Sequence, residues 1–113
     1  MIAVLGSFRF PPEAIERARW LMRAVIEATL AEPGCRAYSY AEDVAEPGSR
    51  AYTYAEDVAE PGCFRVTELW DSRKALSAHF DTPHMREWVE QRAALGFFDR
   101  RIALHEIGAT EEL

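Results

Sequence analysis

Apolar and polar residues alternate with a period of two in several parts of the chain, and this period predicts β-strands. Residues 64–70 place four side chains on one face, Phe64, Val66, Glu68 and Trp70. Residues 2–10 and 101–107 alternate as well, but residues 2–10 are largely apolar on both faces. Such a strand is covered on both sides, and a chain with few helices needs a second copy of itself to cover the second side. The pattern therefore predicts three strands and a homodimer.

Between the first two of these strands, apolar residues recur at steps of three and four, which indicates an amphipathic helix. The helix opens at Pro11-Pro12-Glu13, where proline and an acidic residue suit a first turn, and ends before Pro33-Gly34. Its apolar stripe consists of Ile15, Ala18, Met22, Val25 and Thr29. Trp20 lies off the centre of this stripe, so packing or an interface is favoured over a role as a lid on a pocket.

The helical period returns after residue 70. Asp71 and Ser72 are residue types that cap helices, and the spacing beyond them predicts a short helix. Pro83 interrupts that helix and fits the first turn of another, which is expected to continue to about residue 95. Gly96 terminates it, because glycine suits the conformation that follows a helix end. The next four residues are predicted to be a connection that leads to the final strand.

A direct tandem duplication lies between the first helix and the strand at 64–70. Residues 31–44 read AEPGCRAYSYAEDV and residues 45–58 read AEPGSRAYTYAEDV, and a third AEPG begins at Ala59. The period of 14 residues is too short for a solenoid. Each copy has tyrosines on one face and Pro-Gly turns beside it, which predicts a strand. We expect one copy to fill a single strand position, while the other lengthens the hairpin, loops out or pairs with a partner chain.

Without the second copy, the order of elements is strand, helix, strand, strand, helix pair, strand. This is the βαββαβ pattern of the ferredoxin-like α+β folds, with an antiparallel sheet. A chain of 113 residues has the length of one domain, so we expect a single domain over residues 1–113.

Charge and composition narrow the classes of partner. The formal net charge is −6 and no basic run occurs, which argues against nucleic acid and against an anionic membrane surface. No apolar stretch is long enough to span a bilayer. The first basic residue, Arg9, is followed at once by Pro11-Pro12, which does not fit a signal peptide. The sequence therefore predicts a cytoplasmic protein that binds a small organic molecule or another protein.

The two cysteines do not indicate a metal site. Cys35 and Cys63 each follow a Pro-Gly pair and lack the spacing of zinc ligands. Free thiols are favoured over a disulfide between them, since a reducing compartment is expected. No Gly-rich phosphate loop or nucleophile elbow occurs in the chain.

The chemically active side chains gather around the break between the two later helices. Trp70 ends a strand, and His79 and His84 stand on either side of the break. A catalytic role for His79 and a buried structural role carry equal weight. Helix capping or surface exposure is favoured for His84, and core packing is favoured over substrate contact for Trp70.

Four segments of the chain resemble the antibiotic biosynthesis monooxygenase (ABM) family of small dimeric α+β barrel proteins. They are Glu32-Pro33-Gly34-Cys35 before a tyrosine strand, Glu68-Leu69-Trp70 with Asp71-Ser72, Ala78-His79-Phe80, and Pro83-His84-Met85. The resemblance covers nearly the whole chain apart from the inserted copy. Members of the family include quinol and anthrone oxygenases that use dioxygen without metal or flavin, relatives that degrade haem, and proteins without an established activity. Haem degradation is less favoured, because those relatives have an asparagine on the first strand where this chain has Ser7 or nothing comparable.

The resemblance implies a monooxygenase that needs no cofactor or metal and oxidises a small aromatic, quinol- or anthrone-like substrate. Such chemistry needs a base, a donor for the developing oxyanion and a dry aromatic cavity. The catalytic candidates are His79, His84 and Trp70, and the substrate-binding candidates are Tyr38, Tyr52, Arg65, Arg86 and Phe80. The alternative is a non-catalytic dimeric module of the same fold that binds a ligand or a protein, since fold does not decide function.

Overall fold

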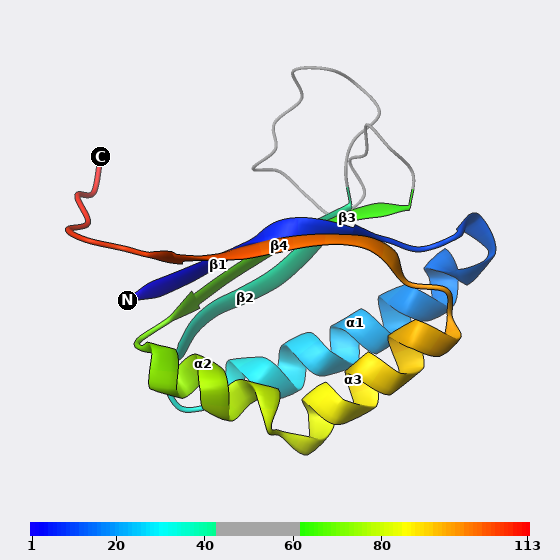
Figure 1. The fold of residues 1–113 in the computed structure, drawn as a ribbon, viewed down its shortest axis with the longest axis horizontal. Helices are drawn as coiled ribbons and strands as arrows, with labels where there is room; N and C mark the ends of the chain where they lie inside the picture. The colour runs from blue at the N-terminus through cyan, green and yellow to red at the C-terminus, as the bar shows by residue number, and fades with distance from the viewer. Residues whose placement is uncertain (43–61) are drawn as a thin grey trace.

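In the computed structural model, one antiparallel sheet of four strands carries its helices on one face (Figure 1). The structure describes residues 1–42 and 62–113. The elements in chain order are β1 (Ile2–Arg9), a 3-10 turn η1 (Pro12–Ala14), α1 (Ile15–Leu30), β2 (Cys35–Glu42), β3 (Cys63–Trp70), α2 (Arg73–Phe80), α3 (Pro83–Ala94) and β4 (Phe98–Glu106). The strand order is β2-β3-β1-β4, which confirms the predicted ferredoxin-like α+β fold.

The register of the sheet gathers the large side chains of the central strands on one face. Tyr38 of β2 stands opposite Glu68 of β3, and Val4 of β1 stands opposite the same glutamate. Because residues directly opposite each other on neighbouring strands point to the same side of a sheet, these three residues share one face, and the helices cover it. The predicted alternation of residues 64–70 is thereby confirmed, with Phe64, Val66, Glu68 and Trp70 buried on that inner face.

Two apolar clusters fill the space between sheet and helices. The larger contains Phe8, Phe64 and Trp88, together with Ala18, Met22 and Val25 of α1. The smaller contains Tyr38, Trp70 and other residues at the end of the sheet near α2. Within α1 the buried residues are Ala18, Met22, Val25 and Thr29, as the helical period predicts. Trp20 is 62% exposed, with the Arg23 guanidinium 5.4 Å from its ring centroid.

Local signals in the sequence place the later helices correctly. The Ser72 side chain accepts a hydrogen bond from the Ala75 amide and caps α2, and Thr82 caps α3 in the same way through the Met85 amide. Pro83 occupies the first turn of α3, where its missing N–H costs nothing. None of the helices among the described residues has both the length and the apolar character that a membrane span requires.

The start of the last strand differs from the prediction. Phe98 and the two residues after it belong to β4 and do not form a connection, and the strand ends at Glu106. Asp99 has a φ of 51°, and the pairing of β1 with β4 shifts register between Ser7 and Arg9. Such a bulge breaks the period of two, so the alternation that marks a strand is missing there.

The first copy of the duplicated segment supplies β2, since Cys35–Glu42 lies within residues 31–44. The second copy, residues 45–58, lies outside the described residues, and so does the predicted binding residue Tyr52. The hypothesis that this copy lengthens the hairpin, loops out or pairs with a partner chain therefore stays a prediction. Cys35 and Cys63 are not joined by a disulfide.

Candidate functional site

A cavity of ≈ 250 Å³ lies between the inner face of the sheet and helices α2 and α3. Most of its wall is apolar or aromatic, as is usual for sites that bind small organic molecules. Its polar groups come from the side chains of Tyr38, Tyr40, Glu68, Arg92 and Arg100. The volume suits a small ligand, and the wall combines an acid, two phenols and two guanidinium groups.

Glu68 is the carboxyl group of this cavity, and the alternation of β3 turns it inward with only 7% exposure. The indole Nε1 of Trp70 donates a hydrogen bond to its Oε2 at 3.0 Å. Burial disfavours the charged form and raises the pKa of Glu68 to about 7, although the hydrogen bond from Trp70 opposes the shift. At neutral pH this carboxyl is therefore able both to accept and to release a proton.

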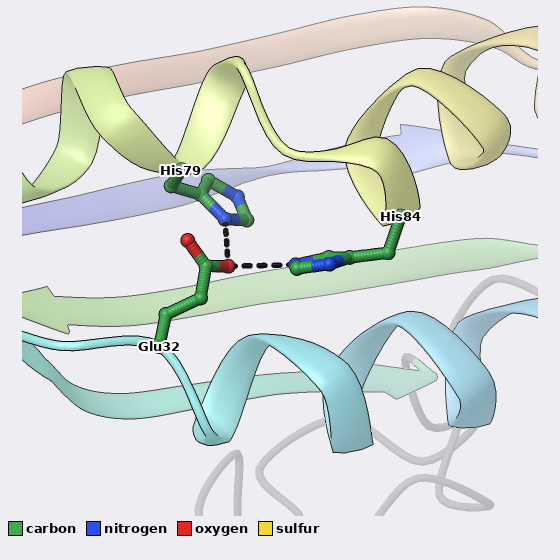
Figure 2. Close-up of side chains that lie close together, drawn as sticks. All are labelled: Glu32, His79 and His84. Atoms are coloured by element: carbon green, nitrogen blue, oxygen red, sulfur yellow. Dashed lines mark hydrogen bonds and ion pairs between the residues drawn. The ribbon is translucent and has the colours of Figure 1, made fainter.

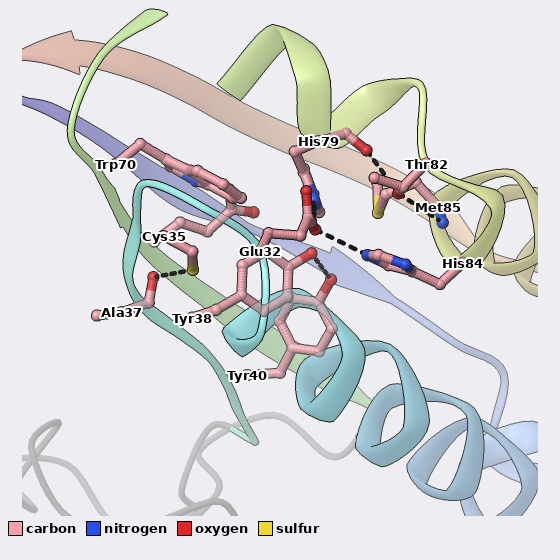
Figure 3. Close-up of polar contacts among 11 residues, drawn as sticks. Glu32, Cys35, Ala37, Tyr38, Tyr40, Trp70, His79, Thr82, His84 and Met85 are labelled. Atoms are coloured by element: carbon pink, nitrogen blue, oxygen red, sulfur yellow. Dashed lines mark hydrogen bonds and ion pairs between the residues drawn. The ribbon is translucent and has the colours of Figure 1, made fainter. Parts of the chain in front are cut away.

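Tyr38 and Tyr40 form a hydrogen-bonded pair beside Glu68. Their hydroxyl oxygens are 2.6 Å apart and point toward each other (Figure 3). Burial is the main reason that the pKa of each phenol lies above its ordinary value, so both hydroxyls stay protonated at neutral pH. One hydroxyl donates to the other, and the hydrogen of the second is available to a ligand.

Arg92 and Arg100 give the cavity positive charge. The Arg92 guanidinium lies 4.3 Å from the ring centroid of Phe97 and 5.8 Å from that of Trp88. Burial, and after it the charge of Arg100, lowers the pKa of Arg92, which nevertheless remains charged. In the part of the chain that the structure describes, neither arginine forms an ion pair. The pair is therefore able to stabilise a negative charge on a ligand.

A second polar cluster lies where α1, α2 and α3 approach one another (Figure 2). The Oε2 atom of Glu32, in the turn after α1, is 2.6 Å from Nδ1 of His79 and 2.7 Å from Nε2 of His84. The side chains are 11%, 1% and 24% exposed, respectively. Burial lowers the pKa of His79 despite the hydrogen bond to Glu32. The other ring nitrogen of His79, Nε2, is buried and has no hydrogen-bond partner among the described residues.

This cluster stands directly behind one wall of the cavity. The His79 ring centroid is 4.7 Å from that of Trp70 and 5.4 Å from that of Tyr38. Tyr38 lines the cavity, whereas His79 and His84 do not. Figure 3 shows Glu32 and its two histidines as neighbours of the tyrosine pair. The two sites share a wall but have separate polar atoms.

Comparison with known proteins matches this fold and these motifs to one family. The sequence profile of the antibiotic biosynthesis monooxygenase family matches residues 1–49 and 39–91. The chain belongs to the ABM family. The two matched segments overlap inside the duplicated region, and together they include every described cavity residue up to Trp88.

Individual relatives agree with this ABM assignment. An uncharacterized protein of Synechocystis sp. is 32% identical over 112 residues, which cover 99% of this chain and 67% of that protein. A Deinococcus radiodurans structure, described as a candidate antibiotic biosynthesis monooxygenase, has a TM-score of 0.82 at 25% identity and covers 100% of this chain and 98% of its own. A crystal structure of an antibiotic biosynthesis monooxygenase has a TM-score of 0.76 at 28% identity, with 96% and 100% covered. Rv0793 from Mycobacterium tuberculosis has a TM-score of 0.70 at 29% identity, with 98% and 96% covered.

The structure brings some of the predicted site residues of this ABM protein together and separates others. Tyr38 and Phe80 line the cavity. Trp70 is completely buried beside it, between Glu68 and the histidine cluster. Arg86 is exposed on α3, where its guanidinium donates to the carbonyl of Asp81. Arg65 lies on the outer face of the sheet, away from the cavity, because it alternates with Val66 and Glu68.

Five polar residues of the two sites were not among the predicted site residues. They are Glu32, Tyr40, Glu68, Arg92 and Arg100. The sequence carries a signal for one of them, because Glu68 interrupts an otherwise apolar strand face and such an acid is costly to bury without a role. The contacts of Glu32 and Arg92 depend on the packing of distant segments, and no local pattern reveals them.

Proposed function

We propose that this ABM family member is a cofactor-independent monooxygenase that oxidises a small aromatic, quinol- or anthrone-like substrate with dioxygen. The observation that carries the proposal is Glu68, a carboxyl group in an aromatic cavity with a pKa of about 7. A general base works best when its pKa lies near the working pH. Family membership supports the reaction class, and the size of the cavity, ≈ 250 Å³, supports a small substrate.

For an anthrone-like substrate, the proposed reaction starts when the Glu68 carboxylate removes a proton from the acidic methylene of the substrate. The resulting carbanion transfers its electrons to dioxygen and forms a C–O bond, and Glu68 returns its proton to the new peroxide anion. Glu68 then removes the second hydrogen of the same carbon as a proton, while the O–O bond breaks and releases hydroxide. Hydroxide takes the proton from Glu68 and leaves as water. One methylene and one dioxygen thus become one carbonyl and one water.

The remaining polar groups of the cavity have supporting roles. The free hydrogen of the Tyr38–Tyr40 pair donates to the oxygen on which negative charge develops, and Arg92 adds its positive charge. Donors that are already oriented stabilise such charge more effectively than water does. The aromatic wall excludes water, which strengthens these interactions.

His79 is an alternative base in this proposal. Its Nδ1 is engaged with Glu32 and the ring does not line the cavity, so the geometry favours Glu68. The roles predicted for His79, His84 and Trp70 stay predictions, and so does the cytoplasmic location. We propose a homodimer as well, because Leu5 on the outer face of the sheet is 45% exposed.

The test is dioxygen uptake by chelator-treated protein with a panel of dihydroquinones and anthrones, after subtraction of autoxidation. We expect uptake above background that Glu68→Gln reduces by at least about 100-fold, the usual cost of losing a general base. Glu90→Gln, which changes an exposed acid on α3, serves as the matched control and should retain full uptake. Uptake lost in His79→Ala but kept in Glu68→Gln would assign the base to His79. A wild-type protein without uptake on any substrate would overturn the proposal.

A further inference from the structure

The cluster of Glu32, His79 and His84 lies outside the cavity in which Glu68 is proposed to act, and its three side chains are of the types that bind metal ions. Two imidazoles and one carboxylate are a common ligand set for first-row transition metals, and they leave coordination positions open. We propose that Glu32, His79 and His84 bind a divalent transition-metal ion such as Zn²⁺. The site goes beyond the proposed function, because none of its ligands lines the substrate cavity.

The three ligand atoms are already close together. They come from the turn after α1, the last turn of α2 and the first turn of α3, and all lie within 4.8 Å of one another. An ion at about 2.0–2.2 Å from each atom requires the ligand atoms to be about 3–3.5 Å apart. The two contacts of Glu32, at 2.6 and 2.7 Å, are hydrogen bonds whose protons occupy the place of the ion. Binding therefore requires each neutral histidine to carry its proton on the other ring nitrogen, and it lengthens both contacts by less than about 1 Å.

The buried carboxylate of Glu32 also favours a bound cation. Its side chain is only 11% exposed, and among the described residues its ion-pair partners are the two histidines alone. No arginine or lysine of the described chain neutralises this carboxylate. Burying a carboxylate is costly unless a cation or several donors compensate, and a divalent ion supplies both the charge and the directed bonds.

The positions of the ligands leave the site accessible from solvent, and they connect it to the wall of the cavity. The His84 side chain is 24% exposed at the N-terminal turn of α3, so an ion has a path from solvent, whereas His79 at 1% exposure forms the closed side. A bound ion would join the turn before β2 to both later helices. Since the His79 ring packs on Trp70 and Tyr38, the metal would stiffen the wall that the site shares with the cavity.

The test measures metal binding without any substrate, so its outcome is separate from that of the oxygenase assay. Isothermal titration of chelator-treated protein with Zn²⁺ should show one ion per chain, and Co²⁺ should give the visible absorption of a site with nitrogen and oxygen ligands. Glu32→Gln and His84→Ala should each weaken Zn²⁺ binding by at least about 100-fold. The third histidine of the chain provides the matched control, since His105 is exposed on β4, and His105→Ala should bind as the wild type does.

Two further measurements, circular dichroism and thermal unfolding, distinguish a loss of metal binding from a loss of folding. Glu32→Gln keeps the size of the side chain and one acceptor oxygen, so its circular dichroism should match the wild type even if His84→Ala is less stable. Zn²⁺ at about 100 times its dissociation constant should raise the thermal unfolding midpoint of the wild type by several degrees, and that of Glu32→Gln much less. Absence of binding at about 100 µM Zn²⁺, or binding that both variants retain, would overturn the proposal and leave a hydrogen-bonded cluster only.

Discussion

Glu68 links the chemistry of the cavity to the stability of the fold at the scale of one residue. Its pKa rises from 4.5 to about 7 on folding, so the folded protein holds a proton that the unfolded chain has lost between those pH values. Its contribution to stability is complete below about pH 4.5 and declines as the pH rises toward 7, by about 3 kcal/mol in total. Glu68→Gln should abolish this decline. Thermal unfolding of both proteins from pH 4 to 8 measures the difference, and parallel curves would contradict the assignment.

The hydrogen bond from Trp70 adjusts the proton affinity of the same carboxyl. The indole N–H stabilises the charged form of Glu68 and thereby opposes the effect of burial. Trp70→Phe removes this donor, so the pKa of Glu68 should move further above 7. The carbon-13 NMR titration of the Glu68 carboxyl measures the shift directly and requires no activity. Trp20→Phe, which alters an exposed indole on α1, is the control and should leave the titration unchanged.

At the scale of elements, the turn between α1 and β2 determines where Glu32 lies. Gly34 has a φ of +81°, and a Cβ placed there would lie 2.6 Å from the Cβ of Ala75 on α2. Its carbonyl also accepts a hydrogen bond from the Asp71 amide at 2.8 Å. Gly34→Ala should therefore push the turn away from α2 and lower the free energy of unfolding by about 1–3 kcal/mol, as judged by urea denaturation. Gly108→Ala should have no effect, because a Cβ there meets no atom within 4 Å.

Elements whose signals are local or periodic could be predicted from the sequence, whereas contacts between distant segments could not. The starts of the two later helices were predictable because their signals are local, such as the capping residue Ser72 and Pro83 in a first turn. The inner face of β3 was predictable because alternation has a fixed period. The start of β4 was not, since the bulge at Asp99 breaks that period. The contact of Glu32 with its two histidines joins residues 47 and 52 positions apart, and only the folded chain brings them together.

The whole molecule should tolerate removal of the second repeat. β2 ends at Glu42 and β3 begins at Cys63, so deletion of residues 45–58 leaves residues 43, 44 and 59–62 between two antiparallel neighbours. A connection of about six residues is ordinary for adjacent strands. We expect the shortened protein to fold with the same pairing of Tyr38 opposite Glu68. Hydrogen exchange of the β2 and β3 amides measures this, and loss of protection in β2 would show that the first copy needs the second.

The outer face of the sheet is the expected interface of a homodimer. All the helices lie on the inner face (Figure 1), whereas the outer face carries Leu5 at 45% exposure and an exposed Thr67 opposite it in the register. If two such faces pack together, a charge at Leu5 would be buried without a partner, which is severely unfavourable. The wild type should therefore sediment as a dimer, and Leu5→Glu should raise the dimer dissociation constant by at least about 100-fold. Val89 on α3 has the same 45% exposure, so Val89→Glu is the matched control and should remain dimeric. A monomeric wild type, or equal effects of both substitutions in analytical ultracentrifugation, would place the interface elsewhere or rule it out.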